Sequence, residues 1–532
     1  MTEPSIASTS QSQISCFDPA TGDFLGEVPT MGEEEVRAAV QAARRAQWSW
    51  AKTNYDQRRS ILSDILDYTV RHTQDICRIA ARDSGKTMVD AAMGEVFPVC
   101  EKLKYTIAEG ERILAPESRS SGFLLHKSAQ VHYQPLGVIG VICPWNFPFH
   151  NLFCPTIPAL FSGNAVVAKV SEWTSWSAAE YIEIFHRVLR KHGFSSDLVQ
   201  IVTGYGETGS HLVRSGVDKI FFTGSPENGQ KVMQAASESL TPVVLELGGK
   251  DPLIVCDDAN LEQAADAAML GVFTACGQMC VGAERIYVFD QVHDAFIKIL
   301  DRRVAELRQG PPLGSELVDL GATTMPAQLE IIESLVQDAV DKGAQLIHGG
   351  KKGAHQTGQY YEPTLLTEVN HTMRITQEEC FGPVMVIMRV QDETEVIRLA
   401  NDSRYGLGSS VFTRNQERGI KIAKAIRSGM SVVNDYGIAY MMQDLPFGGV
   451  GISGFGRING PEGLRACCHQ KAIVSDRVSF GKSFAVHPIR AQSFDLVENA
   501  IQCIYGRQTR NRAQAAIAAA RNLFALRNRK SS

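Results

Sequence analysis

The feature that most constrains the fold is a regular alternation of short apolar segments with longer amphipathic ones between residues 136 and 290. The short segments are rich in Val, Ile and Leu, whereas the longer ones carry apolar residues at the three- and four-residue spacing of helices. Strands that alternate with helices of this length form parallel sheets with helices on both faces. The expected strands are 136–144, 165–170, 198–204, 218–224, 241–249, 251–258 and 284–290, and the expected helices between them are 174–192, 207–215, 226–239 and 260–275.

This alternation predicts an α/β protein with more than one sheet. Amphipathic helices are also expected at 33–52 and 56–82, ahead of the first buried strand. A second α/β unit is expected to begin near residue 250, where the alternation continues after a pair of glycines. A chain of 532 residues is long enough for about three units, and it can bury several cores without disulfides or metals.

The composition is that of an ordinary globular enzyme and excludes some partners. The net charge of −5 argues against a nucleic-acid-binding protein, which usually carries a strongly basic domain. The twelve cysteines form no metal-type CxxC pairs, so we expect no metal, and free thiols fit a reducing compartment. Because no signal peptide and no long apolar run is recognised, a cytoplasmic location is expected.

The C-terminal segment has a different character from the rest of the chain. Between Arg507 and Ser532 it contains seven basic residues and no acidic ones, with Ile517, Phe524 and other apolar residues among them. One interpretation is a terminal helix that packs its apolar stripe on the body of the protein. The other is a basic amphipathic helix that makes weak contact with an anionic membrane surface or an acidic partner.

Three residues have the chemistry of covalent catalysis. Cys280 lies in a loop between an expected helix and strand, where a thiol is either an activated nucleophile or a small buried hydrophobe. Glu246 ends an apolar strand, where it either acts as a general base or pairs with Lys250. Asn146 lies in a loop fixed by two prolines, where its amide either donates to an oxyanion or belongs to an ordinary turn.

Two further segments have the chemistry of a nucleotide site. Lys169 and Glu172 follow the second expected strand, and a glutamate there can accept hydrogen bonds from ribose hydroxyls while repelling the 2′-phosphate of NADP. The segment FTGSPENG (222–229) opens a helix, and Gly224 and Ser225 would let the chain approach a pyrophosphate. This segment is not a GxGxxG motif, so it is weak evidence by itself.

Taken together and in this order, these segments closely resemble the motifs of the aldehyde dehydrogenase superfamily. LELGGK (245–250) and GQMC (277–280) resemble its two active-site signatures. The resemblance covers about residues 15 to 475. Other segments similar to motifs of the superfamily are PWNFP (144–148), KVSE (169–172), FTGS (222–225), EECFGPV (378–384) and LPFGGVGISGFGR (445–457).

The resemblance implies a role for each matching residue. Cys280 resembles the nucleophile and Glu246 the general base, and Asn146 with the backbone N–H of Cys280 resembles the oxyanion hole. The residues implied to contact NAD are Trp145 and Ser225 at the pyrophosphate, Lys169 and Glu172 at the adenosine ribose, Glu379 at the nicotinamide ribose, Phe381 beside the nicotinamide ring, and Gly224 and Leu247. Those implied to line the aldehyde tunnel are Phe147, Asn151, Cys154, Met279, Val281 and Phe447.

Within the superfamily the chain is most similar to the plant branch called family 22. The segments RDSGKTMVDA (82–91), LGVIGVICPWNFPFHN (136–151), EGLRACC (462–468) and VENAIQCIYG (497–506) carry this likeness. Members of that branch have an N-terminal hydrophobic segment that directs them to the secretory pathway or membrane. The expectation for this sequence is different, because no such segment is recognised in it.

The implied reaction is NAD-dependent oxidation of an aldehyde to a carboxylic acid through a thiohemiacetal and a thioester on Cys280. Glu246 favours hydrolysis of the thioester, because CoA-acylating relatives typically lack this base. Glu172 favours NAD over NADP. The mostly apolar tunnel contains no Arg or Lys, so we expect aliphatic or aromatic aldehydes. The alternatives are a CoA-acylating enzyme and a non-catalytic scaffold of the same fold, although a scaffold does not need the three catalytic residues.

The resemblance also implies self-association and domain limits. Family members form dimers or tetramers, for which a hairpin at 121–135 and a strand at 469–475 would provide edges that a partner chain can pair with. We expect the aldehyde dehydrogenase fold, with a Rossmann-like NAD-binding domain, a catalytic domain and a small β oligomerisation element. The expected limits are 1–14 for a disordered N-terminus, 15–120 and 137–247 for the NAD-binding domain, 248–448 for the catalytic domain, 121–136 and 466–475 for the oligomerisation element, and 476–532 for a C-terminal extension.

Overall fold

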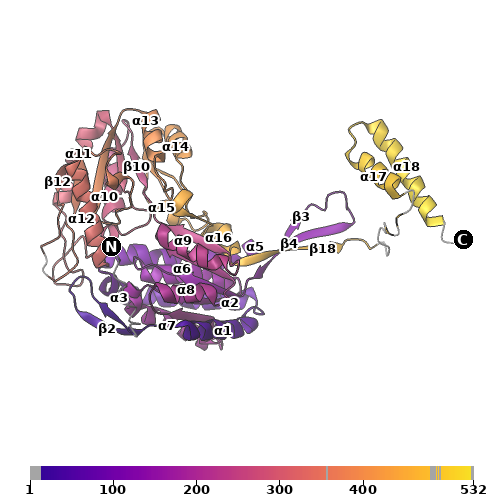
Figure 1. Cartoon of the computed structure of the whole chain (residues 1–532), viewed down its shortest axis with the longest axis horizontal. Coiled ribbons are helices and arrows are strands. Elements are labelled where there is room, and N and C mark those ends of the chain that lie inside the picture. Colours follow the sequence, from indigo (N-terminus) through magenta and orange to yellow (C-terminus); the bar gives the residue numbers. More distant parts are fainter. Residues whose placement is uncertain (1–12, 355–356, 480–486, 488, 490–492, 529–532) are drawn as a thin grey trace, which may run out of the picture. The chain divides into compact units, whose positions relative to one another are not determined.

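The computed structural model describes residues 13–354, 357–479, 487, 489 and 493–528 (Figure 1). The chain divides by its contacts into two compact units, Met1–Leu114 with Gln134–His469, and Ala115–Tyr133 with Gln470–Ser532. The first unit contains a six-stranded and a seven-stranded sheet, and both are mostly parallel. The predicted α/β class with two parallel-sheet domains is therefore confirmed.

The first large sheet consists of five parallel strands and one short antiparallel strand at its edge. Two neighbouring inner strands, β5 and β6, are almost wholly buried, which explains their runs of Val, Ile and Ala. In spatial order the strands are β17 (Gly454–Phe455), β9 (Val243–Leu247), β8 (Lys219–Gly224), β5 (Val138–Ile142), β6 (Ala165–Lys169) and β7 (Val199–Val202).

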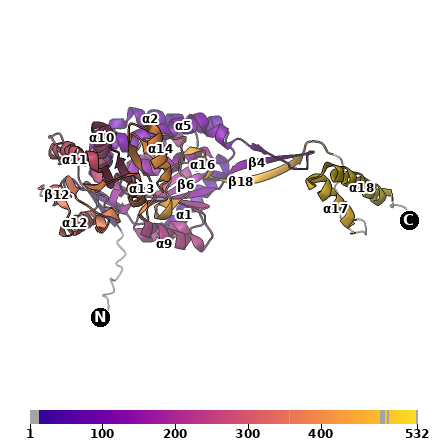
Figure 2. The same ribbon diagram turned by 90° about the horizontal axis from the view of Figure 1, so that it is seen from above.

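Helices cover both faces of this sheet. Figure 2 shows α2 and α5 on one side of β6, and α1 and α9 on the opposite side. Because the strands are parallel, their carboxyl ends all meet at one edge, where α/β folds bind ligands. The first face carries α6 (Pro148–Phe161) and α7 (Ser175–Lys191), with α2 (Tyr55–Arg71), α3 (Thr73–Ser84) and α5 (Phe97–Leu114) around them, and the second face carries α1 (Glu33–Trp50), α8 (Gly206–Arg214) and α9 (Pro226–Ser237).

The second large sheet is parallel except for its β12–β13 pair. Helices α10 (Leu261–Phe273) and α11 (Asp290–Ala305) pack on one face, and α12 (Pro326–Asp341), α13 (Glu393–Asn401) and α14 (Gln416–Ala425) pack on the other. In spatial order the strands are β12 (Gln345–His348), β13 (Thr364–Thr367), β14 (Val384–Val390), β11 (Arg285–Phe289), β10 (Pro252–Val255), β15 (Ser410–Phe412) and β16 (Val432–Val433).

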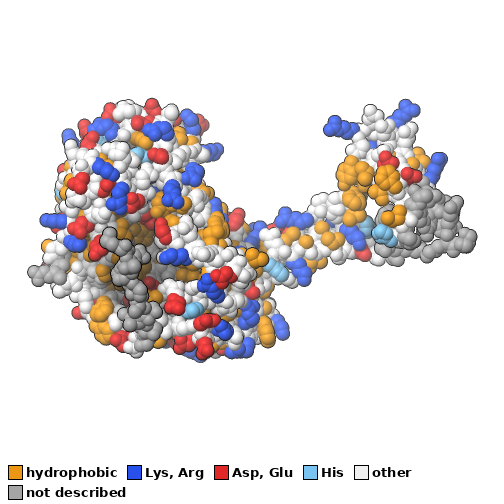
Figure 3. Space-filling view, viewed as in Figure 1, with side chains coloured by type: hydrophobic (Ala, Val, Ile, Leu, Met, Phe, Trp, Pro, Cys, Tyr) orange, Lys and Arg blue, Asp and Glu red, His pale blue; other side chains and the backbone are white. Residues whose placement is uncertain are grey.

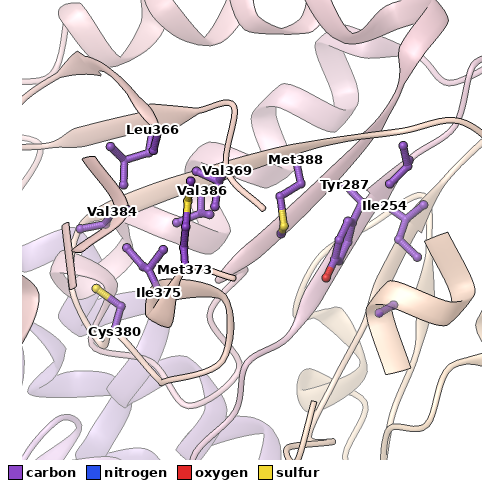
Figure 4. Close-up of a cluster of buried hydrophobic side chains, with 14 of the residues drawn as sticks. Ile254, Tyr287, Leu366, Val369, Met373, Ile375, Cys380, Val384, Val386 and Met388 are labelled. Carbon is purple, nitrogen blue, oxygen red and sulfur yellow. The ribbon is translucent and has the colours of Figure 1, made fainter. Parts of the chain in front are cut away.

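The core of this sheet shows why its strands have no polar alternation. Figure 4 shows Val384, Val386 and Met388 of β14 on the same hydrophobic cluster. The intervening residues Met385 and Ile387 belong to the cluster on the opposite face. Side chains of a strand point alternately to its two faces, so a strand covered on both faces is apolar throughout.

Several short elements complete the first unit. Strands β1 (Gln13–Phe17) and β2 (Phe24–Pro29) form an antiparallel pair. Helix α4 (Met88–Ala91) continues through a π-helical turn, Ala92–Val96, directly into α5. The remaining short helices are α15 (Ile438–Met441) and α16 (Gly460–Arg465), and the 3-10 turns are Glu172–Thr174, Ser196–Leu198, Thr274–Gly277, Arg374–Thr376 and Gly451–Ser453.

The second unit contains a small antiparallel sheet and a pair of helices. The sheet has the order β18 (Cys468–Asp476), β4 (Lys127–Pro135) and β3 (Glu117–Arg119). Helices α17 (Ser493–Tyr505) and α18 (Thr509–Asn528) pack against each other. None of the helices within the described ranges is long and apolar enough to cross a membrane.

Three boundaries differ from those expected. The range 56–82 contains two helices, because the backbone of His72 (φ −108°, ψ 20°) leaves the helical path. The hairpin expected at 121–135 begins earlier, at β3. The residues between β3 and β4 form a loop with exposed apolar side chains instead of a strand. Of the terminal segment 1–14, residues 1–12 lie outside the described residues, and Gln13 and Ile14 pair with β2.

Candidate active site

One cleft lies at the carboxyl end of the six-stranded sheet and is lined by every residue that we assigned to catalysis or to the cofactor. Its cavity volume is about 920 Å³, which suits a cofactor or small molecule. Because β5, β6, β8 and β9 all end there, segments far apart in the sequence meet at this edge. The eleven residues are Cys280, Glu246, Asn146, Trp145, Lys169, Glu172, Gly224, Ser225, Leu247, Glu379 and Phe381.

Glu246 and Cys280 lie beside each other in this cleft and shift each other's pKa. Glu246 belongs to β9 and is 4% exposed, and burial raises the pKa of its carboxyl to about 7. One of its oxygens, Oε1, is buried and has no hydrogen-bond partner. The pKa of the half-buried Cys280 thiol is raised well above its usual range, first by desolvation and then by the Glu246 charge. The thiol is therefore protonated at neutral pH, and the carboxylate beside it can accept its proton.

The backbone before Cys280 is held in an unusual conformation. Ala275, Cys276 and Gly277 have φ values of 49°, 58° and 73°, which place three successive residues in the left-handed region. Such a run is costly for residues that carry a Cβ. At Gly277 a Cβ would also lie only 2.1 Å from the carbonyl oxygen of Gly382, so this position of the GQMC motif requires glycine.

Gln278 of the same motif links three parts of the site. Its backbone carbonyl accepts a hydrogen bond of 3.0 Å from the Asn146 side-chain amide. Its side-chain oxygen accepts the Thr324 N–H at 2.9 Å. Asn146 also accepts from the Asn151 amide at 3.1 Å, so its orientation is fixed from both sides. An amide nitrogen has two hydrogens, and the second is available to a developing oxyanion in the cleft.

A buried ion pair holds the Asn146 loop through a hydrogen bond to its backbone. The Lys86 ammonium donates to Glu95 at 2.5 Å and to the backbone carbonyl of Asn146 at 2.6 Å, and it lies 4.2 Å from the centre of the Phe147 ring. Glu95 belongs to the π-helical turn Ala92–Val96, and its carboxylate accepts the His150 N–H at 2.8 Å near the start of α6. The pair therefore holds both the end of β5 and the start of the next helix.

The glycine pair in LELGGK allows neighbouring segments to approach. A Cβ on Gly248 would lie 2.2 Å from the Glu379 carboxylate, and one on Gly249 would lie 2.3 Å from the Cys280 carbonyl oxygen. The Gly249 N–H donates to Glu379 at 3.0 Å. The next residue, Lys250, is fully buried and forms an ion pair with Glu284. The motif thus positions two loops as well as the base.

Glu284 fixes the segment that carries the predicted nicotinamide contacts. Its carboxylate accepts the backbone N–H groups of Cys380 at 2.7 Å and Phe381 at 2.9 Å. The Phe381 ring meets Trp145 edge-on, with 5.4 Å between the ring centres. The two aromatic rings are therefore in direct edge-to-face contact at the wall of the cleft.

The other end of the cleft has the groups of a nucleotide site. Lys169, at the end of β6, donates to Glu172 at 3.0 Å, which holds that carboxylate at the wall of the cleft. Ser225 caps the first turn of α9 by accepting the Asn228 N–H at 3.3 Å, and Pro226 follows it. Because Pro226 has no N–H and that of Asn228 is bound to Ser225, the Glu227 N–H is the backbone donor that the start of α9 leaves for an anion in the cleft.

The six residues predicted to line the aldehyde tunnel do not line this cleft. Val281 and Phe447 belong to a small apolar cluster that Cys280 and Met279 also touch. Phe147 and Cys154 are buried, and Asn151 is half-buried beside Asn146. Cys280 thus lies between the large cleft on one side and an apolar cluster on the other.

Two residues near this cluster were missed by the sequence analysis. Tyr440 of α15 packs edge-on against Phe447 with 4.6 Å between ring centres, and its hydroxyl hydrogen-bonds to His150. Burial lowers the pKa of His150 to about 4, so the ring is neutral. Tyr405 and Trp173 also line the cleft. Trp173 directly follows the KVSE segment, which was a usable signal, whereas no local pattern marks Tyr405.

Comparison with known proteins decides the family. A model of the aldehyde dehydrogenase family matches residues 6–473. The chain belongs to the aldehyde dehydrogenase family. As members of that family do, it has the fold and the cleft of an oxidoreductase that uses NAD or NADP.

Relatives of this aldehyde dehydrogenase span nearly its whole length. A putative aldehyde dehydrogenase-like protein of Schizosaccharomyces pombe is 40% identical over 473 residues, which are 88% of this chain and 90% of the relative. The NADP-dependent succinate-semialdehyde dehydrogenase of Escherichia coli is 34% identical over 85% of this chain and 92% of its own. The betaine aldehyde dehydrogenase of Staphylococcus aureus, solved with NAD, is 29% identical with a TM-score of 0.84, covering 91% of this chain and 95% of the other.

Proposed function

We propose that the protein oxidises an aldehyde to the carboxylic acid with NAD, through a covalent bond between the aldehyde carbon and the sulfur of Cys280. The observation that carries this proposal is that Cys280 and Glu246 lie close enough to interact, in a cleft that Asn146 also lines. A nucleophile, a base and an oxyanion donor that meet in one cleft are the requirements of acyl chemistry.

In the first step the Cys280 thiol is protonated and the Glu246 carboxylate beside it is ionised. Glu246 accepts the thiol proton as the Cys280 sulfur bonds to the carbonyl carbon, and the electrons of the C=O bond move to the oxygen, where the Asn146 amide stabilises the charge. NAD, when bound, accepts the hydride that leaves this carbon. Cys280 then carries a thioester. After releasing its first proton, Glu246 draws a second from water, which attacks the thioester, and the Cys280 sulfur leaves.

The cleft fits NAD on several counts. Its volume is large enough, and the start of α9 lies in its wall, where a helix N-terminus suits a pyrophosphate. Glu172 favours NAD over NADP because its carboxylate repels a 2′-phosphate. Replacing Glu172 with Gln should raise kcat/KM with NADP more than with NAD, and an equal effect on both cofactors would contradict this preference.

Hydrolysis is the outcome that Glu246 supports. A base with a pKa of about 7 can activate water near neutral pH. The alternative, a CoA-acylating enzyme, would transfer the acyl group to a thiol and form acyl-CoA. The other alternative is a scaffold of the same fold, which has no use for the Glu246–Cys280 contact. Adding CoA to the assay and measuring acyl-CoA separates the first alternative from the proposal.

The proposed substrates are aliphatic or aromatic aldehydes. Val281, Phe447 and Met279 present apolar surface beside Cys280. Two buried lysines lie close by, Lys86 beside Phe147 and Lys102 beside Cys154. Their ammonium groups are already bound to Glu95 and to the Asn459 side chain, so neither is free to bind the second carboxylate of an acidic semialdehyde. The His150–Tyr440 pair adds polar groups nearby. A panel in which short acidic semialdehydes had the highest kcat/KM would contradict this assignment.

We also propose self-association into a dimer or tetramer, through the small sheet. β18 lies at an edge of this sheet, and eight of its nine residues are exposed. An exposed edge of this length can pair with a strand of another subunit. We assign NAD binding to the domain of the six-stranded sheet, whose strand ends line the cleft, and catalysis to the domain of the seven-stranded sheet, which contributes Cys280.

A cytoplasmic location is supported by the cysteines. All twelve carry free thiols, as expected in a reducing compartment.

We also propose a likeness to the plant family 22 branch, on the segments 82–91 and 497–506. The first of these contains Lys86, which supports the Asn146 loop.

The direct test of activity is NADH formation with a panel of aldehydes, using the parent protein and Cys280→Ala. The proposal predicts NADH formation by the parent and none above background by the variant. Full activity of the variant would show that Cys280 is not the nucleophile. If neither protein oxidises an aldehyde while NAD still binds, the scaffold alternative replaces the proposal.

A further inference from the structure

The helix pair α17–α18 has an apolar stripe that lies outside the contact between its two helices. Phe494, Val497, Ile501 and Tyr505 are spaced three, four and four residues apart on α17, so they lie on one face of the helix. Their exposed fractions are 72%, 40%, 54% and 68%. Four large apolar side chains in a row at this exposure exceed the scattered exposed residues of an ordinary surface.

The stripe is distinct from the surface that joins the two helices. Leu496 of α17 and Ala515 of α18 are buried, whereas Val497, next to Leu496, belongs to the exposed stripe. Arg512 of α18 donates to the Cys503 carbonyl at 2.8 Å, near the end of α17. The two helices therefore pack against each other through other side chains, and the stripe is a second apolar face of α17.

The helix pair has more basic than acidic side chains, but the two acidic ones, Asp495 and Glu498, belong to α17 itself. Arg507 and Arg510 follow the end of α17, and Arg521 lies further along α18. The segment from Arg507 to the C-terminus has seven basic residues and no acidic one. Figure 3 shows orange apolar side chains gathered on one side of the helix pair, with blue side chains of Lys and Arg nearby.

We propose that α17–α18 is a docking surface for anionic phospholipid membranes, with the stripe Phe494, Val497, Ile501 and Tyr505 inserted among the lipids and the arginines on the headgroups. A helix with an apolar aromatic face and neighbouring basic residues lies in the plane of a membrane surface. None of the described helices is able to span a membrane, so the contact is peripheral.

The charges favour a lipid surface over a second copy of the chain. The segment 493–528 carries five arginines against two acidic residues, Asp495 and Glu498. Two copies would each bring this net positive charge to a two-fold contact, and like charges oppose such a contact. An anionic bilayer instead attracts each basic residue near its surface, by roughly fivefold in binding per residue at ordinary salt. This surface is separate from the catalytic cleft, so the proposal does not depend on the dehydrogenase activity.

The test is co-sedimentation of the full-length protein with vesicles of phosphatidylcholine alone or with about a third of phosphatidylserine. We expect binding to the phosphatidylserine vesicles only, weakened by high salt. Phe494→Ser with Ile501→Ser should lower it at least tenfold, because two apolar insertions are lost. Arg510→Ser with Arg521→Ser should lower it on the order of tenfold or more. Leu317→Ser, which removes an exposed leucine of the first unit, is the matched control and should bind normally.

Solution size and enzyme activity complete the test. All variants should keep the melting temperature and the activity of the parent, since the altered side chains are exposed. Equal binding of the stripe variant and the parent, or no binding by the parent, would overturn the proposal. It would also be overturned if the stripe variant bound vesicles normally but changed the oligomeric state, because the stripe would then be an interface between copies of the chain.

Discussion

At the scale of single residues, the chemistry of the site depends on whether Cys280 or Glu246 holds the proton. The Cys280 thiol keeps its proton in the resting protein because burial and the Glu246 charge raise its pKa, and Glu246 itself has a pKa of about 7. The thiol is therefore activated by transfer of its proton to Glu246, not by a positive charge beside it. One carboxyl group serves both the attack and the later hydrolysis.

This arrangement predicts a pH dependence. Glu246 must be ionised to accept a proton, so the rate should rise as pH increases through about 7 and fall as Glu246 becomes protonated below it. In Glu246→Gln this rise should disappear and the steady-state rate should fall by roughly a hundredfold or more. The measurement is kcat between pH 5.5 and 9 for both proteins, and an unchanged profile in the variant would contradict the role of Glu246.

Glu246 and Cys280 could be predicted from the sequence because each lies in a short continuous motif. Glu246 and Cys280 each lie in a short segment whose neighbours have a structural purpose, such as Gly249 beside the Cys280 carbonyl. Tyr440 and His150 were missed because they meet only in the folded chain, 290 residues apart. Their contact depends on tertiary packing, which no local pattern records.

At the scale of elements, the loops at the strand ends are held by buried charges. The π-helical turn Ala92–Val96 brings Glu95 to Lys86, and Lys86 reaches the carbonyl of Asn146. The alternation of strands and helices predicted where β5 ends, since this follows from hydrophobic periodicity. It did not predict the π-helical turn, because hydrophobic periodicity gives no signal for one extra residue in a single helical turn.

Removing this ion pair should impair catalysis more than cofactor binding. In Lys86→Met with Glu95→Gln both charges are lost together, so no isolated buried charge remains. The Asn146 loop loses its support, and kcat should fall roughly ten- to hundredfold while the Kd for NAD stays near that of the parent. The exposed pair Lys104–Glu101, changed in the same way, is the control. Equal losses in kcat and NAD affinity would indicate general unfolding of the cleft.

The left-handed run before Cys280 allows a second test. Gly277→Ala should lose most activity and stability, because its Cβ would collide with the Gly382 carbonyl. Gly193 has a similar φ of 77°, but a Cβ there meets no atom within 4 Å. Gly193→Ala therefore isolates the backbone strain, which costs about 1–2 kcal/mol. Similar melting temperatures for the two variants would show that the collision is relieved by local movement.

At the scale of the whole molecule, buried carboxyls couple stability to pH. Asp83 is 1% exposed, its Oδ1 has no hydrogen-bond partner, and burial raises its pKa to about 7. The folded pKa lies above the value of about 3.9 in an unfolded chain, so folding favours the neutral form. The stability that this group contributes is fully present below about pH 4 and is lost as pH rises through 7.

Replacing Asp83 with Asn should remove this dependence. The variant should gain melting temperature relative to the parent as pH rises from 5 to 8, because the asparagine never ionises while its oxygen can keep the Ser177 N–H contact of 2.9 Å. The exposed Glu330 changed to Gln is the control. A difference between the Asp83 variant and the parent that stays constant across this range would show that Asp83 remains ionised in the folded protein.

The most direct test of the central claim is mass spectrometry of Glu246→Gln mixed with NAD and an aldehyde. Loss of the Glu246 charge lowers the pKa of the Cys280 thiol, so at high pH a fraction of it is thiolate and can attack without this base, whereas hydrolysis is slowed. At high pH we therefore predict an added acyl mass on the protein, located on the peptide that contains Cys280, and none in Glu246→Gln with Cys280→Ala. An acyl group on another cysteine, or NADH formation without any covalent adduct, would contradict catalysis through a Cys280 thioester.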